Sequence, residues 1–272
     1  MPQQSLRTER DAAAAYELLS TASEDPAVLA VLTDEELTAL AGAEAAALAG
    51  TPFLDESELD RGAAAAIALR SLVARGLVQL TDEGRETEGE DLATGAEPRR
   101  AAQLDRTLAG LLTLRTSPLA LVHLTRRVAD QTTSLLLSLH PHGGVLEELI
   151  TADGFHHFSL PAREAVPVRL ARYVDADQVA GEADGATTTA TAAELDAGTT
   201  KISRRLQDAR ALTVVTTADG GTSSQLTVVA TTDAVLAMDT PQDAGERVEV
   251  RELGASGLEA LLAAALPDPA AL

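Results

Sequence analysis

The chain of 272 residues contains no cysteine and no tryptophan, and aromatic residues make up only 2% of it. Without cysteine there can be no disulfide, no thiolate nucleophile and no Cys-ligated zinc. Hydrophobic residues nevertheless account for 45% of the chain, which argues against global disorder. The core must therefore be built from leucine, valine and alanine.

Long apolar runs are also missing. No stretch approaches the ~20 apolar residues of a membrane-spanning helix, and residues 1–10 are polar, unlike a secretory signal peptide. The length allows one large domain or two ordinary ones with a substantial core. We therefore expect a cytoplasmic protein.

Basic residues are scarce, because 42 acidic residues face 21 basic ones and Lys201 is the only lysine. A net charge of −21 repels phosphate backbones and anionic lipid, which disfavours nucleic-acid and membrane-surface partners. The acidity suits a soluble carrier or chaperone, and equally a protein whose charge serves solubility alone.

An internal repeat organises the chain. A shift of 91 residues places Leu104-Asp105 on Leu195-Asp196, Leu119–Thr125 on Arg210–Thr216, and Leu135–Leu139 on Leu226–Ala230. Each copy has the pattern of a helix, a meander of about four strands and a closing helix. We predict an α+β fold of two pseudo-twofold related helix–antiparallel β-meander–helix units, with additional N-terminal helices and about eight main strands.

The expected organisation has four segments in one compact, two-lobed body. Residues 1–100 hold N-terminal helices, a short strand and an acidic loop; 101–174 and 192–272 are the two units; 175–191 is an acidic Thr/Ala-rich linker. The predicted N-terminal elements are helices Ala12–Ser20 and Pro26–Leu32, a helix capped by Thr33 that ends near Gly50, a helix Ser57–Arg75, strand Leu77–Leu80, and a loop Asp82–Arg100.

The segment after the second long helix allows a regulatory interpretation. A helix, then Arg-Gly-Leu-Val at 75–78, then a polar turn is how many winged-helix domains pass from the recognition helix to the wing. A helix that reads DNA normally exposes positive charge, whereas Thr51–Gly84 holds six acids against Arg61, Arg70 and Arg75. The preferred interpretation is a helix packed beside a strand.

Histidines form the one cluster that could bind metal. His140, His142 and His156 lie near the edge of the first predicted meander, and three imidazoles could hold zinc for binding or catalysis. Neighbouring strand residues point to opposite faces, so His156 and His157 cannot both reach one ion. We interpret them as turn and surface histidines, and we expect no metal, no cofactor and no catalytic activity.

The run Ala68–Val78, the leucine-rich helix around Leu104–Leu114 and the strand meander together resemble the actinobacterial EspG family of ESX (type VII) secretion chaperones. The resemblance implies a pseudo-twofold α+β body. It also implies a cytosolic, non-catalytic protein that binds the helical tip of a secreted helical-hairpin substrate and keeps that substrate soluble for export.

Recognition is expected where the two copies differ, because shared positions are explained by shared packing. The copies differ at the turns His140–Gly144 and Thr231–Asp233 and at the hairpins Thr151–Gly154 and Thr240–Gly245. We hypothesise that meander strands and turns bind the partner, with His142 and Arg247 as candidate contact residues, and that Asp82–Arg100 and Asp175–Thr191 tune solubility.

Overall fold

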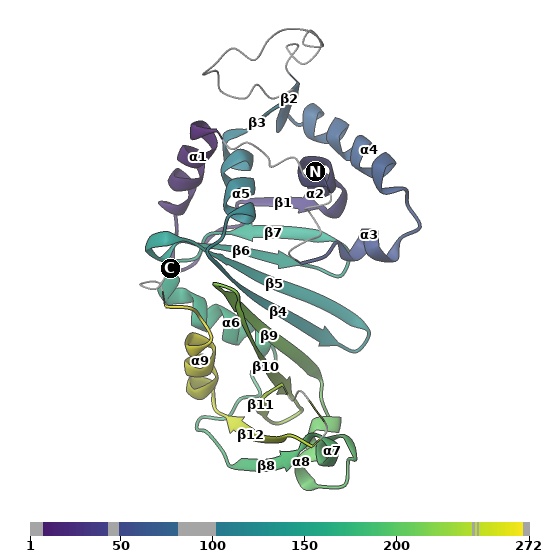
Figure 1. The fold of residues 1–272 in the computed structure, drawn as a ribbon, viewed down its shortest axis with the longest axis vertical. Helices are drawn as coiled ribbons and strands as arrows, with labels where there is room; N and C mark the ends of the chain where they lie inside the picture. Colours follow the sequence, from purple (N-terminus) through teal and green to yellow (C-terminus); the bar gives the residue numbers. More distant parts are fainter. Residues whose placement is uncertain (1–7, 43–48, 81–101, 241–242, 244, 269–272) are drawn as a thin grey trace.

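The computed structural model describes residues 8–42, 49–80, 102–240, 243 and 245–268. Within these residues, one large sheet has the strand order β1-β7-β6-β5-β4-β9-β10-β11-β12-β8, and β2 pairs with β3 in a separate small sheet (Figure 1). Every pair of neighbours in the large sheet is antiparallel. No helix of this part of the chain is long and apolar enough to span a bilayer.

The strands of the large sheet are β1 (Ala30–Thr33), β4 (Ala120–Val128), β5 (Gln131–Leu139), β6 (Val145–Ile150), β7 (Phe155–Ser159), β8 (Thr187–Thr191), β9 (Ala211–Asp219), β10 (Thr222–Ala230), β11 (Val235–Asp239) and β12 (Arg247–Leu253), and the small sheet contains β2 (Val78–Leu80) and β3 (Ala102–Leu104). The helices are α1 (Glu9–Leu19), α2 (Asp34–Ala41), α3 (Pro52–Glu56), α4 (Arg61–Ala74), α5 (Arg106–Thr116), α6 (Val166–Val174), α7 (Ala192–Asp196), α8 (Lys201–Gln207) and α9 (Ala255–Ala264), with short 3-10 turns at Pro141–Gly143 and Arg163–Ala165.

The strand registers confirm the predicted pseudo-twofold repeat. Strand β4 pairs Ala120 with Leu139 of β5, and the 91-residue shift turns this pair into Ala211 and Ala230, which pair in β9 and β10. Strand β4 also pairs with β9, and there Leu124 lies opposite Val215, its own equivalent in the other copy. The pseudo-twofold axis therefore passes between these two residues.

Each copy of the repeat also contains an outer strand that the sequence pattern does not predict. Strand β1 pairs with β7 and β8 pairs with β12, so β1 and β8 are equivalent outer strands. Each leads into a helix with the same Thr-x-x-Glu-Leu capping box, starting at Thr33 in α2 and at Thr191 in α7. Leu195 thus corresponds to Leu37, and its predicted match to Leu104, which ends strand β3, is wrong.

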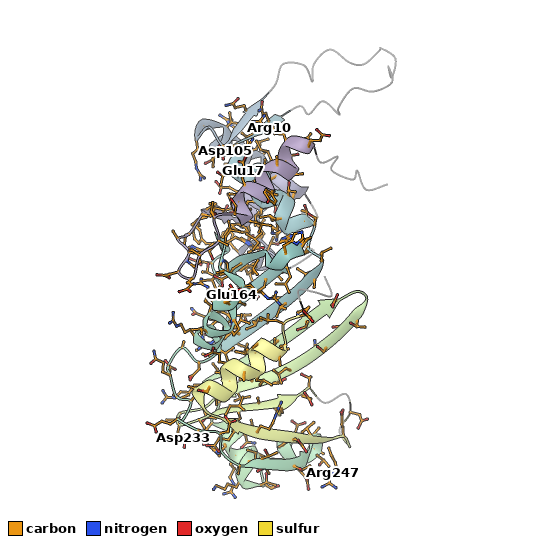
Figure 2. All side chains as sticks on the ribbon, turned by 90° about the vertical axis from the view of Figure 1, so that its left-hand side faces the viewer. Arg10, Glu17, Asp105, Glu164, Asp233 and Arg247 are labelled. Atoms are coloured by element: carbon orange, nitrogen blue, oxygen red, sulfur yellow. The ribbon has the colours of Figure 1, made fainter. Side chains whose placement is uncertain are left out.

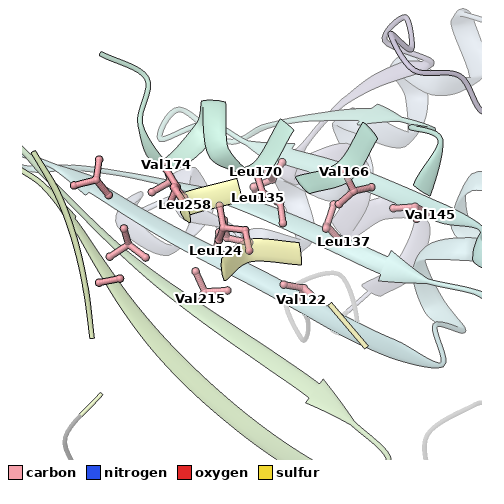
Figure 3. Close-up of a cluster of buried hydrophobic side chains, with 14 of the residues drawn as sticks. Val122, Leu124, Leu135, Leu137, Val145, Val166, Leu170, Val174, Val215 and Leu258 are labelled. Carbon is pink, nitrogen blue, oxygen red and sulfur yellow. The ribbon is translucent and has the colours of Figure 1, made fainter. Parts of the chain in front are cut away.

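Three buried clusters form the core. The largest lies between one face of the central strands and helices α6 and α9, where Leu124 and Leu137 pack near Val166 and Leu170 (Figure 3). On the opposite face, a second cluster joins α1, α2, α4 and α5 to the outer strands of the first half. A third joins α7 and α8 to β10–β12. Helices thus cover the central part of one face and the two outer parts of the other.

Most predicted elements agree with the structure, and the differences have local causes. The predicted helix Pro26–Leu32 is wrong, because Ala30–Thr33 is completed as a strand by pairing with β7. The one helix that the repeat places before the second meander is instead two helices, α7 and α8, with the break near Gly198, which has a φ of 66°. Residues 187–191, expected in the acidic linker, form β8. The predicted loop Asp82–Arg100 lies outside the described residues.

Helix α1 crosses α5 so closely that only glycine fits at one position. A Cβ atom on Gly110 would lie 2.8 Å from the backbone of Ala14. We expect Gly110→Ala to lower the free energy of unfolding by about 1–3 kcal/mol, because α1 must move away. The matched control is Gly62→Ala in the first turn of α4, where the nearest atom is 3.4 Å away. That control should be neutral or stabilising by about 0.5 kcal/mol. Urea denaturation measures both, and equal losses would contradict the close crossing.

Candidate functional site

Within the part of the chain that the structure describes, the two central strands have one uncovered face. Their side chains alternate, so that Val122, Leu124 and Val215 are buried under α6 and α9, while the residues between them are half-buried or exposed on the other face. These outward residues, which we call the central strip, are Leu121, His123, Thr125, Leu212, Val214 and Thr216. An antiparallel sheet commonly packs one face and leaves the other open, and the strip is the part of the second face that lies between the helix-covered outer parts of the two halves.

A cleft of about 590 Å³ opens beside the strip in the first half. Helix α3 forms one wall, and the side chains of His123, Thr125 and Ser134 form part of the sheet side. Four carboxylates line it, namely Asp55, Glu56, Asp130 and Asp153, and we call it the acidic cleft. The second half has no counterpart, because only four residues separate α7 from α8, where the first half inserts α3, α4, β2 and β3 between α2 and α5.

A second cleft of about 320 Å³ lies on the same face, on the other side of the strip. It is lined mainly by apolar side chains from α7, α8 and strands β9–β11, and we call it the apolar cleft; these side chains are Leu195, Leu206, Leu212, Val229 and Met238. Leu212 belongs both to this cleft and to the central strip. The uncovered face is therefore a shallow surface with a charged hollow at one side and an apolar hollow at the other.

Burial shifts the ionisation of the histidine in the acidic cleft. Burial lowers the pKa of His123, and the charge of Glu148 opposes this effect only in part. The imidazole of His123 is therefore neutral at neutral pH. Its ring Nε2 lies 3.5 Å from the hydroxyl oxygen of Thr125.

A buried charged network holds the wall of the acidic cleft. The His156 ring lies between two carboxylates, with Nε2 2.7 Å from Asp34 Oδ1 and Nδ1 2.6 Å from Glu148 Oε1. The other oxygen of Asp34 accepts the backbone N–H of Leu54 in α3, and Arg115 of α5 donates to Glu148 at 2.9 Å. The network thus connects α2, α3, α5 and two strands.

The network is charged and closed to solvent. Burial lowers the pKa of His156, but hydrogen bonds and charge interactions with Asp34 and Glu148 outweigh it, and the pKa lies above its usual value. Burial likewise raises the pKa of Glu148, but His156 and Arg115 bring it below the usual value. Two cations then face two anions, which offsets the cost of burying them. Because His156 and Asp34 are 0% exposed, no substrate can reach them, and their role is to position α3.

The predicted contact residues His142 and Arg247 lie away from both clefts. His142 is exposed in the turn between β5 and β6, with a φ of 59°. Arg247 is exposed at the start of β12, in the lower part of the molecule in Figure 2. Five strand spacings of ~4.8 Å, roughly 24 Å, separate β5 from β12, so only a large partner could touch both residues.

The three histidines of the metal interpretation do not converge. Ser134 lies opposite Ile150, which in turn lies opposite His156. His140 follows the last residue of β5 and is six residues from Ser134, or roughly 20 Å at ~3.4 Å per residue. Burial lowers the pKa of His140 to about 4. Within the described ranges no group of three or more His, Asp or Glu residues has the arrangement of a metal site.

The arginines around α4 do not form a basic face. Arg61 pairs with Asp55 of α3, and Arg75 pairs with Glu36 of α2. Two of the three arginines that a DNA-reading helix would need are thus neutralised by carboxylates of neighbouring helices. Strand β2 pairs with β3, which was not predicted. This arrangement favours a packed structural helix over a recognition helix.

A pseudo-twofold α+β body whose large sheet is continuous and antiparallel is the class of fold defined here, and it is EspG-like, as the sequence resemblance implies. The chain is similar to the type VII secretion system chaperone EspG5 of Mycobacterium tuberculosis, whose structure was solved in complex with a PE25–PPE41 dimer. The TM-score is 0.50 at 7% sequence identity, over 86% of this chain and 94% of that chain. No protein-family model and no curated protein sequence matches the chain.

Sequence reasoning missed the strip and both clefts, although one signal was present. Strand β4 alternates from Ala120 to Thr125, with Leu121 and His123 between buried aliphatic residues. In a strand that turns out to be central, this alternation indicates an uncovered face. No local sequence pattern predicts the position of α3, because α3 is held by Asp34, and Asp34 is 122 residues away from its partner His156.

The charged network predicts a pH-dependent stability. The raised pKa of His156 means that its contribution is complete below the unfolded value of 6.5 and is lost as the pH rises through the folded value. Glu148, with a lowered pKa, contributes above 4.5 and loses that contribution as the pH falls. We expect His156→Asn to lower the free energy of unfolding by about 3–5 kcal/mol and to flatten its decline above pH 6.5.

The matched control is His157→Asn, because His157 lies on the opposite face of β7 and is half-buried. Denaturant unfolding at a series of pH values measures the free energy of all three proteins. Parallel pH profiles for the wild type and His156→Asn would refute a protonated His156 in the folded state.

Proposed function

We propose that this chain is a non-catalytic, cytoplasmic binding protein that holds a helical protein against the central strip. The observation that carries this proposal is the face of β4 and β9 that no described helix covers, whereas the opposite face is packed along much of its length by α6 and α9. This surface is half apolar, is hollowed at both sides, and carries no described helix at its centre, so it suits a helix that lies in a groove.

The fold supports a more specific role. EspG5 is a secretion chaperone that was captured with a PE25–PPE41 dimer, and its fold is shared over most of both chains. We infer by analogy that the partner is a helical protein secreted by a type VII system, and that this chain keeps it soluble for export. A net charge of −21 disfavours self-association of the carrier and binding to nucleic acid.

Substitution within the strip tests the proposal. Thr125 and Val214 face each other across the two strands, and both side chains are half-buried. We expect Thr125→Arg and Val214→Arg to weaken capture of the partner by about tenfold or more, because a bulky charge would occupy the centre of the interface. The readout is co-purification with small helical proteins encoded by neighbouring genes, followed by titration of the purified pair.

The control is Thr188→Arg on the outer strand β8, where an exposed threonine lies at an edge of the sheet, away from the strip. If both strip variants capture the partner as well as the wild type does, with unchanged melting temperature, the proposal is refuted. Stoichiometric zinc in the purified protein would instead favour the histidine interpretation.

A separate proposal is that His142, in the turn after β5, and Arg247, at the start of β12, contact the partner. His142→Glu and Arg247→Glu test it, each with a check of the melting temperature. His142 has a left-handed backbone conformation, which asparagine tolerates better than most residues. His142→Asn is therefore the control that separates loss of contact from backbone strain. Unchanged affinity for both Glu variants would confine recognition to the strip and the clefts.

A further inference from the structure

The two clefts differ in chemistry, and this difference specifies the partner. We propose that the segment held by the central strip is an α-helix with basic residues at the end that enters the acidic cleft and apolar residues at the end that enters the apolar cleft. This inference rests on the proposed function and adds the chemistry and the orientation of the bound helix.

The acidic cleft carries unneutralised negative charge. Asp55 is paired with Arg61, but Glu56, Asp130 and Asp153 are exposed and form no ion pair with the rest of the described chain. Neither arginine nor lysine is among the residues that line the cleft. Complementary charge is how interfaces select and orient a partner, so the matching group is an ammonium or a guanidinium.

The sheet side of the cleft also lacks a hydrogen-bond partner. The side chain of Ser134 is only 9% exposed and lines the cleft, yet its hydroxyl forms no hydrogen bond within the described residues. The oxygen is not closed off from solvent, so it faces the cleft and can accept a hydrogen bond from water or from a ligand that enters. A lysine or arginine that enters the cleft would donate to the Ser134 oxygen. Neutral His123 beside it would not repel that cation.

The opposite end of the surface selects apolar groups. Leu195, Leu206 and Met238 line the apolar cleft together with Leu212 and Val229, and Asp196 is the one charged residue in its lining. Leucine, methionine or phenylalanine side chains are the natural occupants of such a hollow. The two clefts therefore impose a direction on any helix that spans them.

The spacing of the strands fixes the length of that helix. Thr132 on β5 lines the acidic cleft and Met238 on β11 lines the apolar cleft, with β4, β9 and β10 between them. Four spacings of ~4.8 Å give roughly 19 Å, the length of a helix of about 13 residues. Arg127 lies on this route, exposed and opposite Leu212, so it would repel a basic residue at the middle of the helix.

Three synthetic helical peptides of about 16 residues test the orientation with the full-length protein. The first has two arginines at one end and two leucines at the other; the second has glutamates in place of the arginines; the third has the arginines moved to the middle. We expect the first peptide to bind with a Kd about fivefold or more below that of either other peptide, an advantage that shrinks at high salt. Fluorescence anisotropy of labelled peptides measures each Kd.

Two triple variants test whether the acidic cleft causes the preference for the first peptide. Glu56→Gln, Asp130→Asn and Asp153→Asn together should bring the three Kd values to within about twofold of one another. The control makes the same change of charge at exposed acids away from both clefts, with Asp177→Asn, Glu182→Gln and Glu259→Gln, and should keep the preference.

Equal binding of the three peptides, failure of the first peptide to bind, or loss of the preference in the control variant would overturn the inference. If the strip variants nevertheless lose partner capture, the proposed function stands, and only the inference that the bound helix has a basic end is refuted. Full capture by the strip variants would instead remove the proposed function itself.

Discussion

The antiparallel pairing of β4 with β9 is the interaction on which the rest of the structure depends. Eight residue pairs, from Ala120 and Asp219 to Arg127 and Leu212, join two equivalent strands and so merge the two halves into one sheet. Because the join has no free edge, one buried face runs across it and receives α6 and α9 from the two halves. The same join produces the candidate site, since the central strip is its other face.

The repeat explains the shared architecture, and the insertion explains the asymmetry. Both halves use an outer strand, a capped helix, four meander strands and a closing helix. The first half alone inserts α3 and α4, and α3 converts one side of an otherwise symmetric face into an acidic cleft. A symmetric surface would accept a helix in either direction. One inserted wall is enough to distinguish its two ends.

Sequence patterns predicted the elements better than their assembly. The meander of about four strands that was predicted in each copy is present as β4–β7 and β9–β12. It was predictable because each strand alternates or is apolar and most end at Gly- or Asp-containing turns. The outer strands were missed, since β1 is four residues long and β8 is Thr-Thr-Thr-Ala-Thr, so both need a distant partner strand. The strip was visible as alternation in β4, whereas the clefts depend on contacts such as Asp34 with His156, which no local pattern encodes.

The buried network of Arg115, Glu148, His156 and Asp34 has a consequence for how this fold can diverge. Each member compensates the charge of its neighbours in a place without water, so a single replacement leaves an uncompensated buried charge. The four positions lie on α5, β6, β7 and α2 and are far apart in the chain. In evolution they should behave as one inherited character, kept together or exchanged together for apolar residues, and relatives in which they are exchanged would have to anchor α3 by other means.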